Sequence, residues 1–210
     1  MKKAILFDFW GTLVENGVWS PIKQVRNILR IRLPFPEYVV RMEKAMMTSS
    51  FKTLKEAFEA VCDEFNIEPQ QFLLDKLVGM WNKSWMLAKP YPEVEEVLQK
   101  LSKDHTLILV SNTDCFSVSN VLDKFGLKDY FNYLYLSYDL GKIKTDEEFI
   151  KHILQELDLK PSECLMVGDS IQSDMEAAEK AGVEAVLVDR RDTREFNRKI
   201  KSLKEVENYL

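Results

Sequence analysis

The chain is poor in the residues that build thiolate metal sites and imidazole-based catalytic sites. Its three cysteines, Cys62, Cys115 and Cys164, are an odd number without metal-ligand spacing. Its two histidines, His105 and His152, have no partner at catalytic spacing, so we expect surface or capping roles for them. We expect the three thiols to be buried and inert. Reduced thiols favour a cytoplasmic location.

The chain also lacks an excess of positive charge and any long apolar run. It has 29 Lys and Arg residues against 34 Asp and Glu residues, for a net charge of -5. Because no basic excess is present to neutralise phosphates, we expect no nucleic-acid partner and no membrane partner. No run approaches the ~18 apolar residues of a membrane span, and the first strand leaves no room for a signal peptide before it. The densest basic cluster, Arg190, Arg191 and Arg194, is interrupted by acids and predicts a solvated face.

Apolar and amphipathic segments alternate along the second half of the chain. The 210 residues, of which 46% are hydrophobic, are enough for one sizeable core or for a core and a small second unit. Continuously apolar strands followed by helices predict right-handed crossovers and a doubly wound, Rossmann-like parallel sheet, the α/β class. The predicted strands cover residues 3–7, 105–110, 133–137, 164–167 and 185–188, and the predicted helices cover 93–103, 116–125, 146–157, 172–181 and 194–210.

A helical unit interrupts this alternation after the first strand. Pro21 after Ser20 begins one of its four short amphipathic helices, and Thr53 with Glu56 forms a capping box that begins another. The apolar residues of the unit, including Met and aromatic side chains, recur at helical spacing and predict a bundle core. The chain is thus divided into a core domain of residues 1–14 and 89–210 and an inserted helical domain of residues 15–88.

Polar side chains follow three of the predicted strands at the point where each strand ends. Because the carboxyl ends of parallel strands lie at one sheet edge, where open α/β folds bind ligands, we expect these groups to converge. The group comprises Asp8, Thr12, Ser111, Asn112, Asp169 and Asp174, together with Lys144 between the third strand and its helix. Carboxylates bind a hard cation such as Mg²⁺, and hydroxyl, backbone N–H and Lys groups bind anionic oxygens. An Asp at the centre is able to attack phosphorus, so the set predicts a phosphate-and-metal site. A strand-end Asp also caps helices, which is the alternative role for Asp114 and Asp146.

The order and spacing of these residues resemble the haloacid dehalogenase-like hydrolase superfamily, in the subfamily with an inserted four-helix cap. Residues 8–12 match the first motif, the nucleophile loop, and residues 111–112 match the second. Lys144 matches the third motif. Residues 168–170 with Asp174 match the fourth. The resemblance covers nearly the whole chain and implies a Rossmann-like core with a helical cap.

The resemblance also implies the chemistry. Asp8 is the expected nucleophile, and the reaction it implies is hydrolysis of a small phosphorylated metabolite through an aspartyl-phosphate. The implied Mg²⁺ ligands are Asp8, the backbone carbonyl of Trp10, Asp169 and, directly or through water, Asp174. The implied phosphoryl-binding residues are Thr12, Ser111, Asn112 and Lys144, of which Lys144 also orients Asp8 and offsets charge.

Trp10 departs from the family's phosphatases, which carry a second Asp at this position to protonate the leaving group and activate water. An indole N–H does neither, and general acid–base help is typically worth ~10²–10⁴ in rate. We therefore expect weak turnover of unactivated esters unless another acid, such as Asp114 or Glu15, substitutes. Two alternatives stay open: a metal-free 2-haloacid dehalogenase, which carries an aromatic residue here, and a slow or non-catalytic phosphoaspartyl binding protein. Asp169 argues against the dehalogenase, which has no metal-binding acid at that point.

The cap sets the substrate in this architecture, and periodicity does not reveal which of its side chains face the site. The candidate cap contacts are Glu15, Trp19, Arg32, Arg41 and Trp85. The identity of the substrate and the oligomeric state stay open from the sequence.

Overall fold

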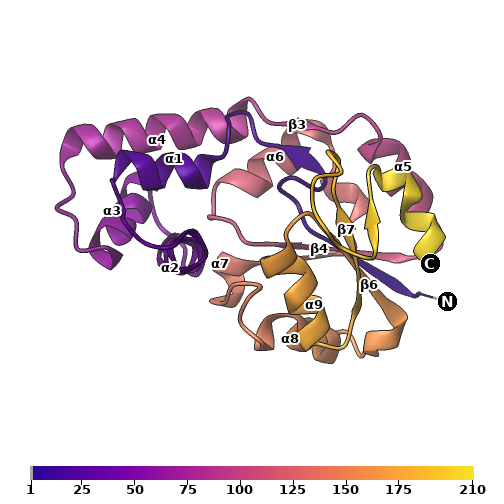
Figure 1. The fold of residues 1–210 in the computed structure, drawn as a ribbon. Helices are drawn as coiled ribbons and strands as arrows, with labels where there is room; N and C mark the ends of the chain where they lie inside the picture. Colours follow the sequence, from indigo (N-terminus) through magenta and orange to yellow (C-terminus); the bar gives the residue numbers. More distant parts are fainter. Residues whose placement is uncertain (1) are drawn as a thin grey trace.

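A six-stranded parallel sheet forms the centre of the protein, in a computed structural model that describes residues 2–210 (Figure 1). The strand order is β5-β4-β1-β6-β7-β8, and each neighbouring pair is parallel. The strands are β1 (Ala4–Phe7), β4 (Thr106–Ser111), β5 (Tyr133–Leu136), β6 (Cys164–Gly168), β7 (Glu184–Val188) and β8 (Lys199–Ile200). The predicted doubly wound α/β class is confirmed, and β1 lies between the two strands whose ends carry the other predicted site residues.

Helices cover both faces of this sheet, as the continuously apolar strands predict. Successive residues of β1 point to opposite faces, so Ile5 and Phe7 join one apolar cluster while Ala4 and Leu6 join the other. The helices of the sheet domain are α5 (Val94–Leu101), α6 (Ser117–Phe125), α7 (Ser137–Leu140), α8 (Glu148–Glu156) and α9 (Glu176–Lys180). Residues of α5 and α6 belong to the first cluster, and residues of α8 and α9 belong to the second. The sheet therefore has a hydrophobic core on each side.

Four helices form a separate bundle beside the carboxyl edge of the sheet (Figure 1). They are α1 (Pro21–Ile28), α2 (Phe35–Met47), α3 (Leu54–Glu64) and α4 (Gln71–Met86). Pro21 occupies the first turn of α1, and the Thr53 hydroxyl accepts a hydrogen bond from Glu56 N at the start of α3. Buried Met and aromatic side chains, among them Tyr38, Met42 and Phe58, build the bundle core, as predicted. The bundle joins the sheet domain through β2 (Val14–Glu15) and β3 (Lys89–Pro90), which pair antiparallel.

The C-terminal segment differs from its prediction. Residues 194–210 do not form one helix: β8 pairs with β7, and a short 3₁₀ helix covers Leu203–Tyr209. The buried Asp189 carboxylate accepts a hydrogen bond from Arg194 N at 2.7 Å and so closes a turn over residues 189–194. This turn, together with the pairing of β8 with β7, outweighs the helical tendency of the segment. The predicted helix over 172–181 begins instead as a π turn at Ile171–Met175 that continues into α9.

The prediction that the cysteines are buried holds for two of the three. Cys62 and Cys164 are buried in the core as predicted, whereas Cys115 is only half-buried, so the prediction that it is buried is wrong. Its thiol lies 3.5 Å from the backbone of Phe51, at the border between the bundle and the sheet domain.

Among residues 2–210, no helix combines the length and the hydropathy that a membrane crossing requires.

Candidate active site

Asp8 lies at the carboxyl end of the central strand β1. Its backbone N–H donates to the Val167 carbonyl of β6 at 2.9 Å, so the sheet hydrogen bonding extends to this residue. The loop that follows turns at Gly11, which has a φ of +81°. A Cβ atom on Gly11 would lie 2.4 Å from Asp169 Oδ2, so only glycine lets the loop approach this carboxylate. The loop and the end of β6 thus meet at one point.

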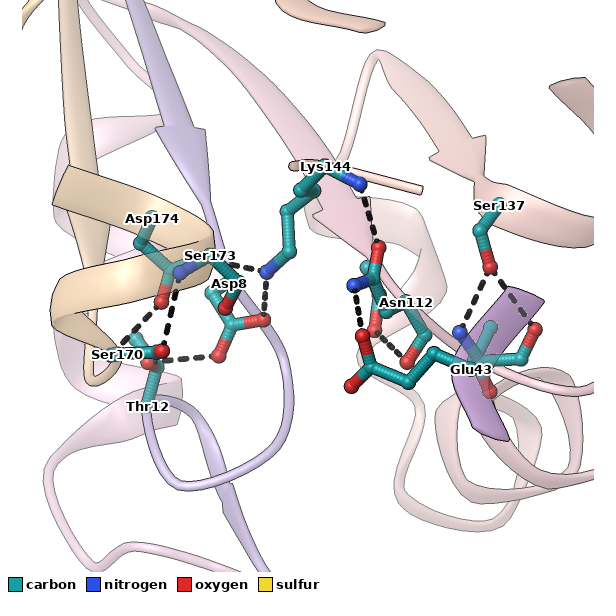
Figure 2. Close-up of polar contacts among 11 residues, drawn as sticks. Asp8, Thr12, Glu43, Asn112, Ser137, Lys144, Ser170, Ser173 and Asp174 are labelled. Atoms are coloured by element: carbon teal, nitrogen blue, oxygen red, sulfur yellow. Dashed lines mark hydrogen bonds and ion pairs between the residues drawn. The ribbon is translucent and has the colours of Figure 1, made fainter. Parts of the chain in front are cut away.

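The Lys144 amino group lies between two carboxylates (Figure 2). Its Nζ atom is 2.5 Å from Asp8 Oδ1 and 2.5 Å from Asp174 Oδ1, and all three side chains are buried. Burial alone would lower the pKa of Lys144, but the carboxylates of Asp174 and Asp8 outweigh it and hold the pKa above its ordinary value. Lys144 is therefore a fixed positive charge that orients Asp8.

Three acids gather around this lysine. Single carboxylate oxygens of Asp8, Asp169 and Asp174 all lie within 4.8 Å of one another. Gly168 permits this approach, because a Cβ atom there would lie 2.3 Å from Asp174 Oδ2. Burial, followed by the charges of Asp8 and Asp174, raises the pKa of Asp169 to about 8. Burial also raises the pKa of Asp8 to about 6, against the opposing effect of Lys144.

The donor set suits a hard divalent cation. Three carboxylates with one lysine leave an excess of negative charge in a buried place, and a cation held by their oxygens would offset both the burial and the mutual repulsion that raise these pKa values. The oxygen-only composition favours Mg²⁺, Mn²⁺ or Ca²⁺ over ions that prefer nitrogen or sulfur. The cluster therefore has the chemistry of a metal site.

The predicted phosphoryl-binding residues divide into two groups. Thr12 donates a hydrogen bond from Oγ1 to Asp8 Oδ2 at 2.9 Å and is fully buried, and Ser111 is also fully buried, with its hydroxyl 3.4 Å from the Asn112 carbonyl. Asn112 lines the cavity, and its Oδ1 accepts from Lys144 N at 2.8 Å. Asn112 thus faces the cavity, while Thr12 and Ser111 support the residues around it.

A cavity of about 430 Å³ lies between the sheet edge and the helical bundle. Its floor is made by Asp8, Trp10, Asn112, Lys144 and Asp169. Its roof is made by residues of the bundle, mostly apolar: Pro21, Ile22, Pro36, Val39, Val40, Glu43, Met47 and Trp81. Every predicted strand-end group except Thr12, Ser111 and Asp174 lines this space directly.

None of the five candidate cap contacts lines the cavity. Trp19 is 70% exposed, and Glu15 and Arg32 are exposed as well. Arg41 binds Glu64 at 2.6 Å, and Trp85 donates to Asn82 at 3.1 Å. A second stripe on α2, which the sequence did not reveal, lines the cavity instead. Its members recur at helical spacing: residues 36, 39, 40, 43 and 47. The stronger stripe of Tyr38, Met42 and Met46 faces the bundle core and concealed it.

Glu43 is the acidic member of this second stripe. Its Oε2 accepts a hydrogen bond from Asn112 Nδ2 at 2.8 Å, which joins the bundle to the sheet domain. Burial raises the pKa of Glu43 to about 7, with the carboxylates of Asp174 and Asp8 adding to the rise and Asn112 and Lys144 opposing it. Glu43 therefore keeps its proton to a higher pH than an ordinary glutamate does.

Asp114 is engaged in structural hydrogen bonds. Its Oδ1 accepts from the backbone N–H groups of Phe116 and Ser117 at the start of α6, which confirms the capping role. Its Oδ2 accepts from the Ser117 hydroxyl at 2.7 Å and from Trp81 Nε1 at 2.8 Å. Asp114 lines the cavity, but both of its oxygens are occupied. Asp146, in contrast, caps no helix and accepts from Ile143 N.

Two arginines of the predicted solvated cluster hold the loops of the site, so that prediction is wrong for them. Arg194 donates hydrogen bonds to the carbonyls of Asp169 and Val188. Arg190 pairs with Glu93 at 2.5 Å, donates to the Thr12 carbonyl at 2.9 Å and stacks on Tyr91. Only Arg191 is exposed as predicted. Asp189 draws Arg194 inward through an ion pair of 3.5 Å, whereas Arg190 is held by Glu93, which is distant in the sequence.

Comparison with known proteins agrees with this geometry. The family model of haloacid dehalogenase-like hydrolases matches residues 2–182. The chain belongs to this family. A phosphoglycolate phosphatase of Aquifex aeolicus is 26% identical over 189 residues, which cover 88% of this chain and 84% of that protein. A D-ribitol-5-phosphate phosphatase of Bacteroides thetaiotaomicron is 28% identical over 194 residues, which cover 88% of this chain and 90% of that protein.

Solved structures of the family share the fold. The crystal structure of a 2-haloacid dehalogenase from Pseudomonas syringae superposes with a TM-score of 0.67 at 21% identity, over 99% of this chain and 97% of that one. At this identity the likeness shows the fold alone. The relatives that carry phosphatase names make phosphatase the better supported of the two activities for this member of the family.

Proposed function

We propose that this haloacid dehalogenase-like hydrolase is a Mg²⁺-dependent phosphatase that acts on a small phosphorylated metabolite through an aspartyl-phosphate on Asp8. The observation that carries the proposal is the cluster of Asp8, Asp169 and Asp174 around Lys144. It combines a buried nucleophile, a fixed cation and a surplus of carboxylates that suits a divalent metal ion. The cavity of about 430 Å³ has room for a small substrate.

Each residue of the site has a role in this proposal. Asp8 attacks phosphorus, and Lys144 keeps it oriented and offsets the negative charge that develops. The metal ion would be held by Asp8, Asp169, the Trp10 carbonyl and, directly or through water, Asp174, and it would supply charge neutralisation at the phosphoryl group. Phosphoryl oxygens lie against Asn112 and the loop of Thr12, with Ser111 behind them.

The two parts of the chain have separate roles in this proposal. Residues 1–14 and 89–210 form the core domain that performs the chemistry, and residues 15–88 form a cap that closes the cavity from above. The stripe of Val39, Val40 and Met47 presents an apolar surface to the part of the substrate beyond the phosphoryl group. This arrangement favours a leaving group of modest size and limited charge.

A dehalogenase is disfavoured by the charges of the site. A 2-haloacid would bring its carboxylate next to Asp8, into a space that already contains Asp169 and Asp174. Without a cation between them, these like charges repel the substrate. A phosphate ester carries its own charge into the same place, but its oxygens are ligands for the metal ion, which turns the acids into supporting groups.

Phosphate release tests the proposal. We would measure it from 4-nitrophenyl phosphate and from an acyl phosphate, with Mg²⁺ and with a chelator, in the wild type and in Asp8→Asn. We expect metal-dependent release that Asp8→Asn abolishes. Release that persists in the chelator, or in Asp8→Asn, would contradict the proposed mechanism, and a parallel halide assay on 2-haloacids without metal decides whether the dehalogenase takes its place.

A further inference from the structure

We propose that Glu43 of the cap serves as the general acid and base of the reaction, in place of the side chain that is missing at Trp10. This inference rests on the proposed phosphatase activity of the Asp8 site. It predicts that proton transfer is carried out by the helical cap rather than by the loop of the nucleophile.

The position of Glu43 is set by hydrogen bonds that lead back to the nucleophile. Asn112 accepts from Lys144 N at 2.8 Å through Oδ1 and donates to Glu43 Oε2 at 2.8 Å through Nδ2. Lys144 in turn contacts Asp8 at 2.5 Å through Nζ. Figure 2 shows the carboxyl groups of Glu43 and Asp8 on the two sides of the space next to the Lys144 side chain. In an in-line displacement the ester oxygen departs on the side of phosphorus opposite the attacking Asp8 oxygen, which is the side where Glu43 lies.

Most of the other carboxyl groups near this space are already committed, and Glu176, which also lines the cavity, is exposed at the start of α9. Asp114 is saturated by the start of α6 and by Trp81, and Glu15, the other acid that the sequence suggested, does not line the cavity. Asp8, Asp169 and Asp174 belong to the nucleophile and metal cluster. The Trp10 ring lines the cavity and packs edge-on against Phe9 at 4.9 Å, so it closes the usual position of the acid with an apolar surface.

The surroundings of Glu43 keep a proton available near neutral pH. Burial among the apolar residues of the roof raises its pKa to about 7. The charged groups that act on it are Lys144, which opposes the rise, and Asp174 and Asp8, which add to it. The other charged groups that line the cavity are Asp114, Asp169, Glu176 and Lys180. A general acid that is partly protonated at the working pH, and whose conjugate base is not too weak, is the most effective donor and acceptor.

An Asp8 oxygen forms a bond to phosphorus as the bond from phosphorus to the ester oxygen breaks, and the electron pair leaves with the ester oxygen. That oxygen takes the proton of Glu43, which gives an alcohol, the aspartyl-phosphate and a Glu43 carboxylate. The carboxylate then removes a proton from water as the water oxygen attacks phosphorus. Asp8 leaves as a carboxylate, phosphate is released and Glu43 is protonated again.

The test compares two substrates that differ in how much they need an acid. The leaving group of 4-nitrophenyl phosphate departs without protonation. The leaving group of phenyl phosphate is similar in size but poorer, so its departure depends more on a proton donor. We expect Glu43→Gln to lower kcat/KM for phenyl phosphate by roughly 10²-fold and to lower it much less for 4-nitrophenyl phosphate. In the wild type, kcat/KM for phenyl phosphate falls as the pH rises through about 7, and Glu43→Gln lacks this fall.

The second step has a readout of its own. Because Glu43→Gln also lacks the base for water, we expect a burst of 4-nitrophenol followed by slow turnover, with phosphorylated enzyme accumulating. The double variant Trp10→Asp with Glu43→Gln restores an acid at the missing position, and we expect it to recover activity on phenyl phosphate. Glu37→Gln is the matched control, because Glu37 lies on the same helix but is exposed and pairs with Arg41. It is expected to behave like the wild type.

Three results would overturn the inference. An equal loss on both substrates shows that Glu43 only positions Asn112. An unchanged activity of Glu43→Gln shows that another group moves the proton. Failure of the wild type to release phosphate from either substrate removes the proposed function itself. If the wild type releases phosphate and Glu43→Gln depends on the leaving group in the same way as the wild type, only the role of Glu43 is removed.

Discussion

Replacing Gly11 with alanine distinguishes a specific clash with Asp169 from ordinary backbone strain. Gly11 has a φ of +81°, which costs an L residue roughly 1–2 kcal/mol. The added Cβ would also lie 2.4 Å from Asp169 Oδ2, about 1 Å short of ordinary contact. Either the loop that carries Trp10 or the Asp169 carboxylate must therefore move by about this distance. A misplacement of ~1 Å in a catalytic group costs about 10²-fold in rate, and we expect Gly11→Ala to lose about this much activity and to require more Mg²⁺ for half-maximal rate.

Gly126→Ala is the matched control for this experiment. Gly126 has a φ of +63° at the end of α6, and a Cβ atom there meets nothing within 4 Å among the described residues. Both variants pay for the positive φ, so both melting temperatures should fall by ~2–4 °C for each kcal/mol. Only Gly11→Ala should lose activity. Phosphate release across a Mg²⁺ titration, with thermal melts of both variants, makes the comparison, and equal activity of the two variants would refute the argument that Gly11 makes room for Asp169.

Three further predictions concern charges around the site. Lys144→Met should destabilise the metal-free protein by about 3–5 kcal/mol, because it leaves buried carboxylates without their cation; denaturant unfolding measures this, and a loss below 1 kcal/mol speaks against it. Asp169→Asn should stabilise the metal-free protein by an amount that grows from about pH 4 to pH 8. Because the pKa of Asp169 is raised to about 8 in the folded protein, the contribution of Asp169 to stability is present below the unfolded pKa and is lost as the pH rises through the folded pKa. Melts in chelator should therefore show the difference in melting temperature between Asp169→Asn and the wild type widening over this pH range. A constant difference would show that the pKa is not raised. Arg194→Ala should weaken Mg²⁺-dependent activity by freeing the Asp169 carbonyl, while Arg198→Ala, which removes only an exposed ion pair, should not; equal behaviour of the two variants contradicts a supporting role for Arg194.

The sequence predicts the strands and the site motifs well because a single physical pattern determines both. An apolar run that ends in Asp8 or in Gly168-Asp169 is at once a buried strand and a polar group at the sheet edge, so the convergence follows from the fold class. The sequence also identifies the four helices of the inserted domain, whose Met and aromatic residues need a common core. In each of these cases the local pattern and the tertiary structure agree.

The site residues that the sequence does not reveal share a cause. Their roles depend on tertiary contacts, which the local sequence pattern does not contain. The cavity stripe of α2 is weaker than the stripe of Tyr38 and Met42, so nothing in the periodicity marks Glu43 as facing a ligand. Arg194 is part of a mixed-charge segment that is typical of a solvated surface, and its contacts with Asp189 and with the Asp169 carbonyl, which turn it inward, arise only in the folded protein. The packing of the helical bundle against the sheet domain determines which side chains of the bundle face the site.

The central claim is that phosphate passes through a covalent bond to Asp8. Rapid-quench samples of the wild type with Mg²⁺ and an acyl phosphate, followed by mass spectrometry of the peptides, test this most directly. The account predicts a phosphoryl group on the peptide that contains Asp8, formed before phosphate is released and absent from Asp8→Asn. Phosphate release without any phosphorylated enzyme, or with the phosphoryl group on another residue, would contradict it.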